Sequence, residues 1–157
     1  MGLALVEERD TTVLKDYKDT DRSRYFNELK AYQELSWATP TLMGHGEFWI
    51  EMERLTPILS LGPDRSRKYR APLRALVQDL HDAGYWHCDV DLSNVVIHPV
   101  RGPLLIDFEN LTEASGPISY DLYGAQAAGV EPAWEGKGPD GVFWSLGGPS
   151  SPSFWWS

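Results

Sequence analysis

Four polar residues in the middle of the chain carry the side chains best suited to catalysis. His87, Asp89 and Asn94 have the spacing H-x-D-x-x-x-x-N, and Asp107 follows an apolar run further along. Amide and carboxylate oxygens suit a hard cation such as Mg²⁺, which takes its other ligands from water and phosphates. A second carboxylate nearby can accept or orient a hydroxyl proton. These residue types predict a Mg²⁺ site at Asn94 and Asp107, with Asp89 facing an acceptor hydroxyl.

A predicted β-hairpin brings these side chains together. Residues 95–97 and 104–106 are short apolar runs, and residues 99–103 between them are rich in turn formers. Short apolar runs bounded by turn chemistry are typical of strands. The hairpin therefore places Asn94, which precedes the first strand, close to Asp107, which follows the second.

Together these motifs resemble the protein-kinase-like superfamily, whose catalytic loop is H-R-D-L-x-x-x-N and whose metal-binding element is D-F-G. Two positions differ, because Asp91 stands where protein Ser/Thr kinases carry a lysine and Glu109 replaces the glycine of D-F-G. The I-D-F-E sequence is similar to that of choline and ethanolamine kinases. In lacking this lysine, the sequence also resembles small-molecule and sugar kinases of the aminoglycoside phosphotransferase type.

The resemblance implies an α+β fold, a minimal two-lobe kinase-like domain with a small antiparallel sheet and one helix in the N-lobe and a reduced helical C-lobe. The chain has 157 residues, 42% hydrophobic and 24% charged, which are values of one globular domain. We expect an N-lobe at about 1–53, a hinge at about 53–56, a C-lobe at about 57–129 and a Trp/Gly/Pro-rich segment at 130–157.

The first half of the chain alternates apolar and polar residues in short runs. We expect strands at 3–6, 11–14, 41–45 and 47–53, a polar turn at 7–10, and a helix at about 22–35. Thr20 or Asp21 is the expected cap of that helix. Phe48, Ile50 and Met52 are the apolar side of the fourth strand.

Two residues of the N-lobe gain a role from the resemblance. Lys15 ends a sequence, T-V-L-K, that resembles the V-A-I-K strand, which implies that Lys15 contacts phosphates, with Lys18 as the alternative. Glu28 corresponds to the helix glutamate of the family and is expected to pair with Lys15, with Glu34 as a weaker candidate. The simpler interpretation is that Glu28 is solvated on an amphipathic helix.

The sequence M-E-R-L is similar to the hinge of small-molecule kinases. The resemblance implies that Glu53, Arg54 and Leu55 bind the adenine edge through their main chain. The following segment, 63–70, is basic. It is either a solvated face of a short helix or a docking site for an anionic acceptor.

A second helix is expected to begin at Pro72 and to end at Gly84. Its apolar residues have helical spacing and predict a buried stripe of Leu73, Leu76, Val77 and Leu80. This helix leads into the catalytic loop, as the central helix of the kinase C-lobe does.

Other residues are expected to support the site. His87 is interpreted as a scaffold residue bonded to backbone near Asp107, and Cys88 as a packed thiol. Glu109 could add a second carboxylate to the metal. Asp121, in a predicted helix at 120–128, resembles a structural aspartate of the family.

Composition limits the classes of partner. The net charge of −9 argues against nucleic acid and anionic membranes as partners. The single cysteine rules out an internal disulfide and favours a reducing cytoplasm, and no run is long enough to span a membrane. The segment 130–157 contains Trp134, Trp144, Trp155 and Trp156, which either pack across the lobe or form a surface for a protein partner or self-association.

The resemblance implies an ATP- and Mg²⁺-dependent phosphotransferase that moves the γ-phosphoryl group to a hydroxyl of a small molecule, sugar or lipid head group. One alternative is an inactive pseudokinase that binds a nucleotide or a protein. The others are a protein Ser/Thr kinase and an enzyme that transfers the nucleotidyl group.

Overall fold

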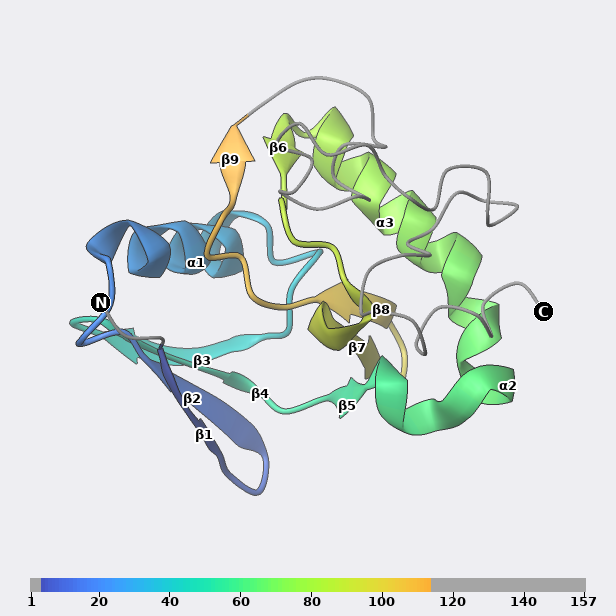
Figure 1. The fold of residues 1–157 in the computed structure, drawn as a ribbon, viewed down its shortest axis with the longest axis horizontal. Coiled ribbons are helices and arrows are strands. Elements are labelled where there is room, and N and C mark those ends of the chain that lie inside the picture. Colours follow the sequence, from blue (N-terminus) through green and yellow to red (C-terminus); the bar gives the residue numbers. More distant parts are fainter. Residues whose placement is uncertain (1–3, 114–157) are drawn as a thin grey trace.

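The computed structural model describes residues 4–113, and its strands and helices form a mixed α+β arrangement (Figure 1). The strands are β1 (Leu5–Glu8), β2 (Thr12–Asp16), β3 (Leu42–Gly46), β4 (Trp49–Glu53), β5 (Thr56–Pro57), β6 (Tyr85–Trp86), β7 (Val95–His98), β8 (Gly102–Leu105) and β9 (Thr112–Glu113). The α-helices are α1 (Arg22–Glu34), α2 (Gly62–Ser66) and α3 (Arg70–Asp82), and 3₁₀ turns lie at η1 (Ile58–Leu61), η2 (Arg67–Tyr69) and η3 (Leu92–Asn94). The prediction of the α+β class agrees with this arrangement.

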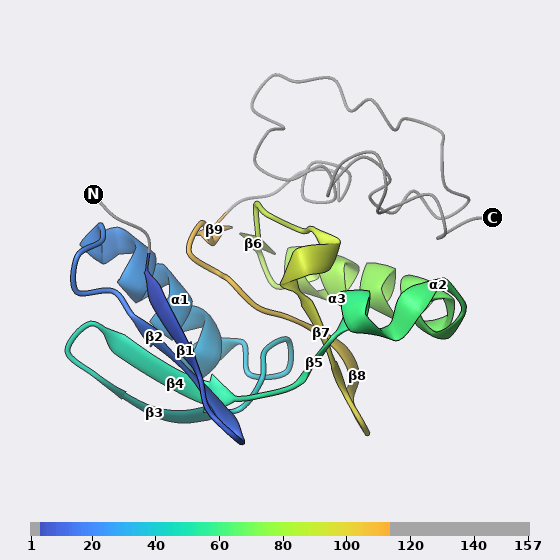
Figure 2. The same cartoon turned by 60° about the horizontal axis from the view of Figure 1, so that its bottom comes forward.

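The first sheet is antiparallel with the strand order β1-β2-β4-β3, and helix α1 packs against it (Figure 2). Ile50 and Met52 of β4 are buried against Tyr25 and Tyr32 of α1, as the alternation in β4 predicts. The predicted strand at 47–53 is too long, since β4 begins at Trp49. Phe48 has φ 63° and belongs to the turn between β3 and β4.

The N-cap of helix α1 is Asp21, whose carboxylate accepts a hydrogen bond of 2.8 Å from Ser23 N. Thr20, the other predicted cap, is buried and its hydroxyl donates to Tyr17 O. Glu28 lies on the buried face of α1 and is 0% exposed. The solvated interpretation of Glu28 is therefore wrong.

The second half of the described chain is built on the predicted hairpin. β7 and β8 pair antiparallel, and the short strand β5 pairs with the other edge of β7. Helix α3 packs on this sheet through the predicted stripe, Leu73, Leu76, Val77 and Leu80. The helix begins at Arg70 rather than at Pro72, and the chain leaves it at Gly84 with φ 92°.

Several predicted boundaries need correction. β1 continues through Glu8, so the predicted turn at 7–10 begins too early. The short strand β9, which pairs with β6, was not predicted. The basic segment 63–70 forms α2 and η2 and then enters α3.

Two further predictions, the helix at 120–128 with Asp121 and the tryptophan-rich segment 130–157, lie outside the described residues. Among residues 4–113, no helix has the length and apolar character needed to cross a membrane.

Candidate active site

The hairpin β7–β8 places Asn94 and Asp107 at its open end. Ile106 N donates to Asn94 O at 2.9 Å, so the residues that precede β7 and follow β8 are directly connected. Asp107 has φ 65°, a left-handed conformation that is uncommon for a residue with a side chain. Both residues line one cavity, and the predicted proximity is present.

His87 supports the backbone on both sides of the site. Its Nε2 lies 2.9 Å from Ile106 O, and its Nδ1 accepts a 3.0 Å bond from Asp89 N. Because Nδ1 is an acceptor and Ile106 O can only accept, these contacts assign the ring proton to Nε2. His87 is buried and its ring meets the Phe108 ring edge-on, with 4.6 Å between the centroids. This geometry fits the scaffold role expected for His87.

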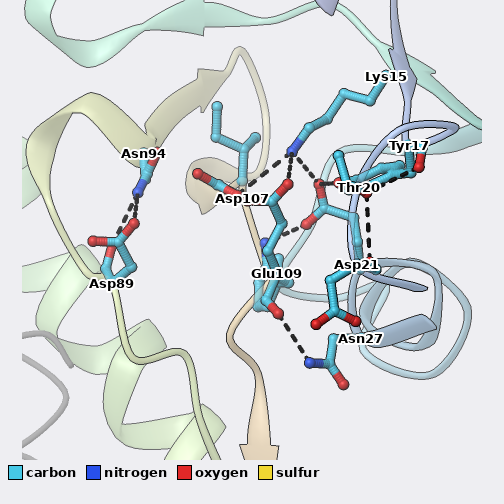
Figure 3. A network of polar contacts seen from close by, with 12 residues as sticks. Lys15, Tyr17, Thr20, Asp21, Asn27, Asp89, Asn94, Asp107 and Glu109 are labelled. Atoms are coloured by element: carbon cyan, nitrogen blue, oxygen red, sulfur yellow. Dashed lines mark hydrogen bonds and ion pairs between the residues drawn. The ribbon is translucent and has the colours of Figure 1, made fainter. Parts of the chain in front are cut away.

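Asp89 and Asn94 are held to each other. Asn94 Nδ2 donates to Asp89 O at 3.0 Å and to Asp89 Oδ2 at 3.1 Å (Figure 3). With the amide nitrogen engaged in this way, Asn94 Oδ1 is the atom left for a ligand. Burial raises the pKa of Asp89, and the nearby Asp107 carboxylate adds to this, while His87 and the Asn94 bond oppose it.

Lys15 faces three carboxylates. Its Nζ lies 2.6 Å from Glu28 Oε1, 3.5 Å from Asp107 Oδ1 and 3.8 Å from Glu109 Oε1 (Figure 3). Burial alone lowers the pKa of Lys15, but attraction to these carboxylates outweighs it, so the pKa lies above its ordinary value. Lys18 is exposed, and Glu34 is exposed at the end of α1, so neither of these alternatives belongs to the site.

Glu28 is the centre of this polar network. Besides Lys15, its Oε1 accepts a 2.7 Å bond from the Tyr17 hydroxyl, and its Oε2 accepts the backbone N–H of Phe108. Burial and the Glu28 carboxylate raise the pKa of Tyr17. Three donors thus satisfy a fully buried carboxylate, which is what its burial requires.

Glu109 lies beside this network with its carboxyl group directed toward Lys15. Burial raises the pKa of Glu109 to about 7, with Lys15 opposing the rise and Asp107 adding to it. Asn27, the neighbour of Glu28 on α1, donates through Nδ2 to Glu109 O at 2.9 Å. Neither Tyr17 nor Asn27 was predicted from the sequence as a site residue. The only signal is their position, Tyr17 two residues after Lys15 on the same side of the chain and Asn27 beside Glu28.

A cavity of about 260 Å³ connects Lys15, Asn94 and Asp107 with the predicted hinge residues Glu53, Arg54 and Leu55. Part of the main chain of the predicted hinge is engaged within the protein. Glu53 N donates to Thr41 O at 2.9 Å and Arg54 N donates to Thr11 O at 2.9 Å, so these two N–H groups are engaged within the protein. All three residues line the cavity and remain predicted contacts of an adenine edge through their main chain.

A second cavity, lined by Arg65, Lys68 and Tyr69, lies on the opposite face of the β5–β7 ladder. Cross-strand partners point to one face, and successive residues point to opposite faces. Pro57 and its partner Val96 line the first cavity, whereas Thr56 and its partner Ile97 line the second. The basic segment therefore does not open into the cavity that holds Lys15.

Comparisons with solved structures find a similar fold in WbdD. A crystal structure of monomeric WbdD matches with a TM-score of 0.60 and 19% identity, over 84% of this chain and 38% of that chain. A medium-resolution structure of the bifunctional kinase-methyltransferase WbdD matches with a TM-score of 0.58 and 18% identity, over 80% of this chain and 34% of that chain.

At these identities the likeness concerns the fold, and this chain spans well under half of the WbdD chains that it matches. No family model matches this sequence, and no curated protein matches it. The α+β fold of residues 4–113 is therefore similar to part of a protein described as a kinase-methyltransferase.

Proposed function

We propose that this chain is an ATP- and Mg²⁺-dependent phosphotransferase that moves the γ-phosphoryl group to a hydroxyl acceptor. The observation that carries the proposal is the lining of one cavity. Lys15, Asn94 and Asp107 line it together with the hinge segment Glu53–Leu55. A phosphate-binding lysine, two oxygen donors for a metal and a main-chain adenine edge are the parts that phosphoryl transfer needs. The similarity of the fold to that of a kinase-methyltransferase supports the same proposal.

The donor set fits Mg²⁺. Asn94 Oδ1 and the Asp107 carboxylate are oxygen donors that line one cavity, and the Asp107 side chain is 31% exposed. Within the described residues, no group of three or more His, Cys, Asp and Glu side chains is arranged to hold a metal. Two protein oxygens are enough for Mg²⁺, which takes its remaining ligands from waters and phosphates. When bound there, the ion would offset negative charge on the phosphates.

The remaining residues bind and orient the two substrates. Lys15 would contact the phosphates, and Glu28 fixes the direction of its ammonium group across 2.6 Å. Asp89 would accept a hydrogen bond from the acceptor hydroxyl and orient its oxygen toward the γ-phosphoryl group. Burial raises the pKa of Asp89, and a carboxylate with a raised pKa is a stronger base toward the proton of the acceptor hydroxyl.

A small molecule, sugar or lipid head group is the acceptor that we favour. Protein Ser/Thr kinases carry a lysine at the position of Asp91, and here the Asp91 carboxylate instead accepts the Ser93 N–H at 3.0 Å. The I-D-F-E sequence ending at Glu109 is similar to that of choline and ethanolamine kinases. The acceptor class rests on these two positions.

Thermal unfolding with ATP, with and without Mg²⁺, tests the proposal. A ligand at about 100 times its Kd stabilises a protein by about 2.7 kcal/mol, or roughly 5–10 °C for a chain of this size. We expect a Mg²⁺-dependent shift in the wild-type protein and none in Asp107→Ala, whose unliganded Tm stays close to that of the wild type. An equal shift in both proteins would overturn the metal assignment, and no shift in the wild type would overturn the proposal.

A transfer assay then separates the alternatives. Mass spectrometry of a panel of hydroxyl compounds distinguishes an added phosphate from an added AMP, and Asp89→Asn is the inactive control that should still bind Mg·ATP. Binding of Mg·ATP without any product would favour the pseudokinase. Phosphorylation of a protein acceptor alone would favour a protein kinase.

A further inference from the structure

Two adjacent residues of helix α1 hold the backbone that follows Asp107. Glu28 Oε2 accepts the N–H of Phe108, and Asn27 Nδ2 donates to the carbonyl of Glu109 at 2.9 Å. The helix therefore binds one main-chain donor and one main-chain acceptor in consecutive residues (Figure 3). Asn27 touches none of the cavity-lining residues through its side chain in the described contacts, so its effect on the site acts through this backbone.

The backbone that these contacts hold is strained. Asp107 has φ 65°, and a left-handed conformation at a residue other than glycine persists only when its surroundings hold it. On the preceding side, Ile106 is held by its N–H to Asn94 O and by its carbonyl to His87 Nε2. On the following side, α1 supplies the contacts to Phe108 N and Glu109 O, and Leu111 N donates to Phe108 O at 3.1 Å.

We infer that Asn27 is a positioning residue, which ties helix α1 to the segment 107–109 and keeps the Asp107 carboxylate turned toward the metal and Lys15. The inference rests on the proposed function for its ligand. It adds that the helix bearing Glu28 is a fixed part of the metal site, because the same helix holds Lys15 and the backbone of Phe108 and Glu109, directly after Asp107.

The test compares Asn27→Ala with Lys30→Ala in the full chain. Lys30, three residues further along α1, makes an exposed 2.7 Å ion pair with Glu113, beyond the strained backbone. Exposed pairs of this kind contribute little to stability. Lys30→Ala therefore removes a contact between the same helix and β9, outside the segment 107–109, without releasing Asp107, and it is the matched control.

The first readout is the Mg²⁺ concentration that gives half-maximal stabilisation by a fixed concentration of ATP. Losing one hydrogen bond corresponds to a change of about 2- to 10-fold, so Asn27→Ala should raise this concentration by that factor. Binding of ATP without metal should stay unchanged, a split that a merely structural defect would not produce. Lys30→Ala should match the wild type in both measurements.

The second readout does not depend on nucleotide. Amide hydrogen exchange in the segment 106–110 should accelerate in Asn27→Ala and not in Lys30→Ala. If the wild type binds Mg·ATP but Asn27→Ala has an unchanged Mg²⁺ requirement, the inference is wrong and the proposed function stands. If the wild type binds no Mg·ATP, the proposed function fails. Unchanged hydrogen exchange in Asn27→Ala would then also overturn the inference that Asn27 holds the segment 107–109.

Discussion

Glu28 is the residue on which the polar network depends. Its side chain is fully buried, and it accepts hydrogen bonds from Lys15, from the Tyr17 hydroxyl and from Phe108 N. A buried carboxylate costs free energy unless its partners satisfy it, so each donor contributes more than it would at the surface. Of these donors, the Tyr17 hydroxyl is the one that a substitution removes without changing the main chain or Lys15.

We predict that Tyr17→Phe lowers the free energy of unfolding by roughly 1.5–3 kcal/mol, since hydrogen bonds to charged groups fall in that range. Tyr25→Phe is the matched control, because the Tyr25 hydroxyl donates to a neutral acceptor, Gly46 O, at 2.6 Å. A neutral bond is expected to contribute about 0.5–1.5 kcal/mol. Urea denaturation of both variants gives the comparison, and a smaller loss for Tyr17→Phe than for Tyr25→Phe would contradict the assignment of Glu28 as a charged acceptor.

At the scale of elements, helix α3 and the turn after it lead the chain to residues 87–94, which include His87, Asp89 and Asn94. The C-terminal cap of α3 is Ala83, and Gly84 follows with φ 92°, a conformation that side chains rarely adopt. β6 begins directly afterwards and pairs with β9, so the direction of the chain at Gly84 sets where residues 87–94 begin.

We predict that Gly84→Ala destabilises the protein by roughly 1–2 kcal/mol, the cost of the left-handed conformation with a Cβ. A Cβ at this position meets no atom within 4 Å, so the cost is conformational rather than steric. Gly44→Ala is the control, because Gly44 has no positive φ and its Cβ would lie 3.6 Å from Trp49, an ordinary contact. Equal Tm values for the two variants would argue against the left-handed turn.

The elements predicted from the sequence are those with a clear local pattern of apolar residues. Local patterns placed β2, β4, α1, α3 and the β7–β8 hairpin within a few residues, because alternation and helical spacing are properties of consecutive residues. The short pair β6–β9 was not predicted, because its two strands are far apart in the sequence and each has only two residues. Phe48 was placed in a strand because it fits the alternation, but the turn after Gly46 gives it φ 63°.

At the scale of the whole molecule, the β5–β7 ladder separates two cavities of different character. One is lined by Lys15, Asn94 and Asp107, and the other by Arg65 and Lys68. The first cavity has two basic side chains in its lining beside three acidic ones, whereas the second has two basic side chains beside one acidic one, Asp64. Only the first also contains the predicted metal ligands.

We predict that Arg65→Glu combined with Lys68→Glu changes the Kd for Mg·ATP by less than about twofold, because exposed charges on the far face are screened at physiological salt. Lys15→Met, in the first cavity, is the positive control and should weaken binding. Isothermal titration calorimetry at 0.15 M salt, a value where screening acts over about 8 Å, gives both constants. A tenfold weakening in the double variant would link the basic segment to nucleotide binding.

The sequence by itself determined which residues could do chemistry here. The spacing of His87, Asp89 and Asn94 and the strand before Asp107 are local, and they were enough to predict a hairpin with a metal pair at its open end. The pairing of Lys15 with Glu28 followed from the resemblance of their surroundings to kinase motifs, and the 2.6 Å contact agrees with it.

The tertiary structure alone decided how those residues are held. The roles of Tyr17 and Asn27, the engagement of the Glu53 and Arg54 N–H groups, and the position of the basic segment on the far face all depend on contacts between residues distant in sequence. Periodicity and motif spacing describe neighbours along the chain, whereas burial and hydrogen bonding across elements depend on how the sheets and helices pack. The left-handed backbone at Asp107 belongs to the second kind, since its neighbours in space hold it.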